Sequence, residues 1–154
     1  MAWAALIEGF SEGNAADVEG HAIAHVLGGY YPVHHGEACA IALPFCMKYN
    51  LPVNTPILAR IAHAMDGSIS GTPEEMAVNG IHAVRQLIDD VGGPSRISDI
   101  EAASRNDIPE MVKLYRTNPN ITEFFEEWCK RETPTEAEAT ALFEEMFEPE
   151  FKVP

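Results

Sequence analysis

The stretch EGHAIAHVLGGYYPVHHGEACAIALP, residues 19–44, contains four of the six histidines of this 154-residue chain and decides its local fold. The pattern predicts a helix over about 15–27, and Gly28-Gly29 is expected to end it because glycine readily adopts the left-handed capping conformation. Pro32 bars helix continuation, so YYPVHH is expected to be a loop. Residues 37–49 are very apolar and predict a second helix, buried on most of its sides.

His21 and His25 are four positions apart on the first of these helices, so their imidazoles project from one face about one turn apart. Two imidazole nitrogens at this spacing can reach one metal ion without bending the backbone. A buried, hydrogen-bonded histidine is nevertheless the commoner reason for such a pair. The loop returns His34 and His35 after a single turn, so a third imidazole can converge on the first two.

Helix signals dominate the rest of the chain as well. Thr72 can cap a helix, Pro73 suits its first position, Glu75 can complete a capping box, and Gly92-Gly93-Pro94 stops it. Residues 50–54 are expected to form a turn, and strand-like alternation, internal repeats and low-complexity linkers are scarce or missing. The sequence therefore predicts an all-α bundle of about six to eight helices in a single domain, residues 1–154. The remaining predicted helices cover 2–12, 55–66, 107–117, 121–131 and 135–148.

Composition and charge exclude several classes of function. The net charge of −14 repels phosphate backbones, so nucleic acid is not an expected partner. No run of 18 apolar residues occurs, and the N-terminus lacks the features of a signal peptide, so no membrane association is expected. There is no GxGxxG or Walker A motif for a nucleotide.

The three cysteines, Cys39, Cys46 and Cys129, form no CxxC pair and are interpreted as reduced thiols of a cytoplasmic protein. Cys39 and Cys46 lie two turns apart on the same face of one predicted helix. They are therefore expected to take part in core packing rather than in a bridge.

The segment HAIAHVLGGYYPVHHGEACAIALP, followed by MKYN, resembles the signature of the iron-containing (group III) alcohol dehydrogenases, in the helical C-terminal domain of that family. The family pattern is roughly His-x3-His-x-Leu-Gly-Gly-x-Tyr-x3-His-Gly-x3-Ala-x3-Pro, and then a short basic-aromatic-Asn stretch. The core of the resemblance covers residues 19–50. This chain meets the pattern at His21, His25, Leu27, Gly28, Gly29, Tyr31, His35, Gly36, Ala40, Pro44 and Asn50.

The resemblance implies that His21 and His35 are metal ligands and that His25 is a catalytic histidine that faces the substrate without binding the metal. The implied ion is Fe2+ or Zn2+, which polarises an alcohol oxygen while hydride leaves the adjacent carbon for NAD(P). Ligating imidazoles must be neutral, so binding is expected to fail below about pH 6. The histidines without a role in the pattern, expected in the loop, at the surface or at the core edge, are His34, His63 and His82.

The family completes its metal site with an Asp-x3-His pair from an earlier helix and binds NAD(P) on a separate N-terminal α/β domain. Asp17 and His21 spell Asp-x3-His, but His21 already occupies the later position in the pattern. We therefore expect a C-terminal fragment that contains no cofactor-binding residues for NAD(P) and is not a dehydrogenase by itself.

Three alternatives stay open. The chain is one half of a split enzyme that requires a separate nucleotide-binding chain, or a repurposed helical oligomerisation or metal-binding module, or a helical domain with packed histidines and no metal. Because a fragment bares apolar surface that the intact enzyme buries, we also expect a homo-oligomer, with 2–12 and 37–49 as contact elements.

Overall fold

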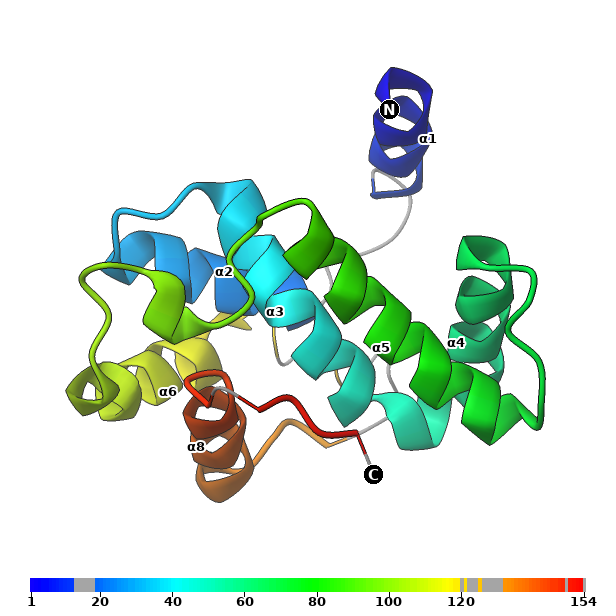
Figure 1. Ribbon diagram of the computed structural model, residues 1–154. Helices are drawn as coiled ribbons and strands as arrows, with labels where there is room; N and C mark the ends of the chain where they lie inside the picture. Colours follow the sequence, from blue (N-terminus) through cyan, green and yellow to red (C-terminus); the bar gives the residue numbers. More distant parts are fainter. Residues whose placement is uncertain (13–18, 120, 122–124, 126–131, 149, 154) are drawn as a thin grey trace.

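The structure is a computed structural model that describes residues 1–12, 19–119, 121, 125, 132–148 and 150–153. Within these ranges every regular element is helical and no strand occurs, which confirms the predicted all-α bundle of six to eight helices (Figure 1). The elements in chain order are α1 (Ala2–Glu12), α2 (Glu19–Tyr30), α3 (His35–Tyr49), α4 (Leu51–Met65), α5 (Pro73–Asp90), η1 (Ile97–Asp99), η2 (Arg105–Asp107), α6 (Ile108–Thr117) and α8 (Glu136–Glu145).

The central helix is α3, because it contributes side chains to both parts of the core. Figure 1 shows α2, α6 and α8 to one side of α3, and α5 and α4 to the other. The larger part of the core lies among α2, α3, α6 and α8, where the fully buried rings of Tyr115 and Phe143 are 5.8 Å apart. In the smaller part, Met47 of α3 packs with apolar side chains of α4 and α5. Phe151 packs against both parts, so the end of the described chain joins them.

The predicted end of the helix over 15–27 was wrong. α2 continues through Gly28-Gly29, and the glycines with positive φ in the described part of the chain are Gly71 and Gly92. The helix instead ends at Tyr30, two residues before Pro32, which has no N–H to donate and disfavours helical backbone in the residue before it. The last helical bond of this segment runs from the Tyr31 N–H to the Leu27 carbonyl at 2.8 Å. The predicted start, near residue 15, lies outside the described residues.

Two further boundaries differ from the prediction. α3 begins at His35 rather than at residue 37, and the Glu37 carboxylate accepts a hydrogen bond from the His34 backbone N–H at 3.2 Å. The turn predicted over 50–54 was wrong, because α4 already begins at Leu51 and the Asn50 carbonyl accepts from the Asn54 N–H. Proline at the second position of α4 suits a helix start.

The capping signals were reliable. α5 starts with the predicted Thr72–Glu75 capping box, and Gly92, at φ +73°, follows its end. α8 starts with a Thr135–Glu138 capping box and ends at Glu145, three residues before the predicted end. α6 agrees with the prediction for 107–117. Most of the helix predicted over 121–131 lies outside the described residues.

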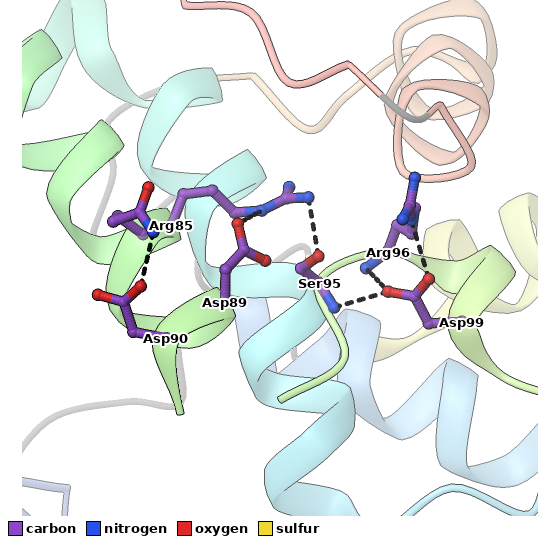
Figure 2. Close-up of polar contacts among 7 residues, drawn as sticks. Arg85, Asp89, Asp90, Ser95, Arg96 and Asp99 are labelled. Carbon is purple, nitrogen blue, oxygen red and sulfur yellow. Dashed lines mark hydrogen bonds and ion pairs between the residues drawn. The ribbon is translucent and has the colours of Figure 1, made fainter. Parts of the chain in front are cut away.

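Polar contacts hold the segment that follows α5 (Figure 2). Arg85 Nη2 donates to Ser95 Oγ at 2.8 Å, and the Asp99 carboxylate accepts from the backbone N–H groups of Ser95 and Arg96. Burial raises the pKa of Asp99, but these bonds and the Arg96 guanidinium outweigh it, so the pKa is lowered overall. The loop between α5 and η1 is therefore tied both to α5 and to itself.

α1 differs from the other helices because Figure 1 shows it standing apart from them. Its apolar side chains Trp3 and Leu6 are 77% and 50% exposed. None of the described helices combines the length and the apolar character that crossing a membrane requires.

Candidate metal centre

The candidate site is built on the helical hairpin of α2 and α3, which are joined by residues 31–34. Small buried residues on the facing sides, Ala22 of α2 with Ala38 and Ala42 of α3, allow the two helices to approach closely. Since the apolar face of α2 is used for this contact, the histidines four positions apart are left on the other side of the helix.

Three imidazoles meet at this hairpin. The ring centroids of His21 and His35 are 5.4 Å apart, and those of His25 and His35 are 5.6 Å apart. His21 is half-buried, while His25 and His35 are exposed. The structure thus brings together the three residues that the sequence singled out, although His35 comes from the first turn of α3 and not from the loop.

A thiol that the sequence analysis assigned to the core lies in the same cluster. Cys39 Sγ is 3.4 Å from His35 Nε2, and one donor atom each of His21, His35 and Cys39 lies within 4.8 Å of the others. Half-buried Cys39 packs against the edge of the larger core, as expected, and its sulfur also lies beside His35, which was not predicted. Cys46 is buried in that core, and burial raises the pKa of its thiol. His35 and Cys39 are four positions apart on α3, the same signal that pairs His21 with His25.

The turn that precedes His35 is held by a contact with η2. Tyr31 is buried, and its hydroxyl donates a 2.8 Å hydrogen bond to the Asp107 carboxylate in η2. Burial and this hydrogen bond raise the pKa of Tyr31 to about 12. The backbone N–H of Val33 also donates to the Tyr31 carbonyl at 2.8 Å, so the turn is tightly specified.

The start of α2, two residues before His21, is anchored by a buried carboxylate. Glu19 is 1% exposed; Tyr115 donates to its Oε1 at 2.9 Å and Asn50 Nδ2 donates to its Oε2 at 2.7 Å. The Asn50 amide also donates to the Cys46 carbonyl of α3. Residues from α6 and from the end of α3 therefore set the position of the helix that carries His21.

The other histidines are exposed and contribute no donor atom to the group of His21, His35 and Cys39. His34 and His63 are exposed, and the exposed His82 of α5 packs its ring 6.1 Å from that of Phe151. Asp17, which forms an Asp-x3-His pattern with His21 in the sequence, lies outside the described residues.

Two imidazole nitrogens and a sulfur fit a divalent transition metal, since imidazole binds both iron and zinc and thiolate favours zinc. His21, His35 and Cys39 are the residues that could hold such an ion. The exposure of His25 and His35 leaves one side of the cluster open to further ligands or to a substrate.

Comparisons with known proteins agree with the fold. Residues 1–137 match the Fe-containing alcohol dehydrogenase family, C-terminal. The 1,3-propanediol dehydrogenase of Klebsiella pneumoniae is 32% identical over 148 residues, which are 96% of this chain and 36% of that enzyme. The 1,3-propanediol dehydrogenase of Citrobacter freundii is 36% identical over 115 residues, 74% of this chain and 30% of that enzyme.

Among solved structures, the alcohol dehydrogenase from Oenococcus oeni superposes with a TM-score of 0.76 at 29% identity. The match covers 90% of this chain and 35% of that protein. The 154 residues thus span about a third of the length of the proteins that they resemble, and they correspond to the C-terminal part.

Proposed function

The chain belongs to the iron-containing alcohol dehydrogenase family, and on that premise we propose that its 154 residues form the metal-binding, substrate-facing half of an alcohol dehydrogenase active site. The observation that carries the proposal is the convergence of His21, His25 and His35. The ring centroid of His35 is 5.4 Å from that of His21 and 5.6 Å from that of His25. The donor chemistry of this cluster fits Fe2+ or Zn2+.

In this proposal His21 and His35 bind the ion and His25 does not. When bound, a divalent ion with an open coordination position polarises an alcohol oxygen and so favours hydride transfer to NAD(P). His25 is exposed beside His35, where its imidazole can exchange a proton with a substrate held at the open side of the cluster. Tyr31 and Glu19 act only through the positions of the helices that they anchor.

The nucleotide is proposed to bind to polypeptide outside these residues. The 154 residues contain no glycine-rich phosphate-binding motif, and the Klebsiella enzyme is nearly three times as long as the matched region. We therefore propose that the 154 residues alone do not oxidise alcohols, and that the missing part is supplied either by the same gene product or by a partner chain. The proposal retains a cytoplasmic location, where Cys39 and Cys46 remain thiols.

The test is complementation. The purified 154-residue chain, loaded anaerobically with Fe2+ or with Zn2+, is assayed with NAD+ and NADP+ on 1,3-propanediol and other small alcohols. We expect no turnover until a separately produced nucleotide-binding segment of the Klebsiella relative is added, and we expect His25→Ala to abolish the restored turnover. Turnover by the chain alone, or restored turnover that is unaffected by His25→Ala, contradicts the proposal.

We also propose self-association, because one face of α4 presents a continuous apolar stripe. Four of its side chains, spaced four positions apart, are 38–56% exposed: Val53, Ile57, Ile61 and Met65. Trp3 and Leu6 are exposed on α1, one of the two expected contact elements. The other expected contact element, α3, exposes one large apolar side chain, Leu43, so we propose α4 as the contact in its place.

Light scattering of the chain at micromolar concentration should give the mass of a dimer or of a larger oligomer. Ile57→Glu should shift the mass toward that of a monomer. A wild-type chain that is monomeric contradicts the proposed self-association.

A further inference from the structure

We propose that Cys39 is a metal ligand, so that this chain offers a three-residue His-His-Cys site selective for zinc or another thiophilic divalent ion. The inference deepens the proposed function, since it rests on His21 and His35 binding the ion. Its starting point is that donor atoms of all three residues lie within 4.8 Å of one another. The three side chains come from two helices, His21 from α2 and both His35 and Cys39 from α3.

The distances suit one ion. Tetrahedral zinc, with bonds of about 2.1 Å to nitrogen and about 2.3 Å to sulfur, separates a nitrogen and a sulfur ligand by about 3.6 Å. Cys39 Sγ and His35 Nε2 are 3.4 Å apart, close to this separation before any ion is present. Because the two residues are one helical turn apart on α3, the contact requires no distortion of the backbone.

His21 supplies a ligand from α2, the other helix of the hairpin. Its ring centroid is 5.4 Å from that of His35, and its position is set by the buried Glu19 at the start of α2. Three protein ligands and one open position form the arrangement typical of a catalytic zinc site. Because His25 and His35 are exposed, a further ligand to an ion held by these three residues could come from solvent, from substrate or from outside the described residues.

The sulfur changes which metal is preferred. Thiolate is a soft ligand that selects zinc over harder ions, and a cysteine that binds such an ion does so after losing its proton. Cys39 is half-buried rather than enclosed, so both the ion and the released proton have access to solvent. The opposing interpretation is that Cys39 only contacts His35 and orients its ring.

Cobalt(II) titration of the purified chain separates these interpretations. Tetrahedral Co2+ gives visible ligand-field bands with any ligands and an additional near-ultraviolet charge-transfer band only with thiolate. We expect both in the wild type, and we expect Cys39→Ser to lose the charge-transfer band and to weaken zinc affinity at least about tenfold. Cys46→Ala is the matched control, because Cys46 is buried two turns along α3 and should leave the band unchanged.

Each outcome has one meaning. Cobalt binding with ligand-field bands but without the charge-transfer band overturns the role of Cys39 and leaves the histidine proposal standing. Failure to bind cobalt or zinc at all overturns both the role of Cys39 and the proposed metal binding by the histidines.

A measurement on the unaltered chain covers the case in which Cys39→Ser fails to fold. Zinc should slow alkylation of Cys39 by iodoacetamide at least about tenfold, as mapped by mass spectrometry, and equal rates with and without zinc overturn the inference.

Discussion

The Tyr115 hydroxyl donates a 2.9 Å hydrogen bond to the buried carboxylate of Glu19, 96 positions away in sequence and two residues before His21. The bond links α6 to the first turn of α2, the helix that carries two of the three clustered histidines. The geometry of the candidate site therefore depends on a polar contact in the interior.

Glu19→Ala should destabilise the chain by about 2–4 kcal/mol, because it leaves two buried donors, the Tyr115 hydroxyl and the Asn50 amide, without their acceptor. Urea unfolding followed by circular dichroism measures the change. Glu101→Ala removes a carboxylate from an exposed position and should alter the free energy of unfolding by no more than about 0.5 kcal/mol. Equal effects of the two substitutions would show that the buried carboxylate does not anchor α2.

Gly80→Ala should separate α4 from α5. A Cβ at Gly80 would lie 2.7 Å from the Ala62 Cβ and 3.1 Å from the Ala62 Cα, so backbone has to move. The expected cost is about 1–3 kcal/mol, in spite of the higher helix propensity of alanine. Gly29→Ala is the control: nothing lies within 4 Å of its added Cβ within α2, so the same exchange should be neutral or stabilising. A stabilised Gly80→Ala chain would contradict the close packing.

Alkaline pH should weaken the fold through Tyr31. Burial and the Asp107 hydrogen bond raise its pKa from 10.0 to about 12, so the unfolded chain loses the phenol proton first. The stability contributed by the neutral phenol is fully present below pH 10 and is lost as the pH rises through about 12. Tyr31→Phe should flatten the fall in melting temperature over this range, although buried Tyr115, whose pKa is also raised, will retain part of it. Tyr30→Phe, at an exposed neighbouring position, should keep the wild-type slope, and a wild-type slope in Tyr31→Phe would contradict the prediction.

His21→Ala should weaken zinc affinity at least about tenfold, because it removes a ligand from the cluster. His34→Ala is the matched control, since His34 is exposed next to His35 but contributes no donor atom to the cluster. Competition for zinc with a chromophoric chelator measures both affinities. A similar loss in the two variants would indicate nonspecific binding by surface imidazoles and not a defined site.

Local patterns in the sequence were enough to predict much of this fold. The capping boxes at Thr72 and Thr135 mark helix starts because their hydrogen bonds join residues three positions apart. The convergence of His21 with His35 was predictable for a similar reason, since the hairpin between them is short and its turn contains proline. In both cases the information lies within a few consecutive turns of the chain.

The sequence alone determined that this chain is helical, where most of its helices begin, and which three histidines meet. Only the tertiary structure decided that α2 continues through Gly28-Gly29, that Glu19 is buried against Tyr115, and that Cys39, at the edge of the core, lies beside His35. The physical reason is the separation in sequence over which each kind of interaction acts. Helix periodicity and capping depend on neighbours three or four positions away, whereas burial, and with it the choice of which face of α3 meets solvent, depends on helices that are distant in sequence.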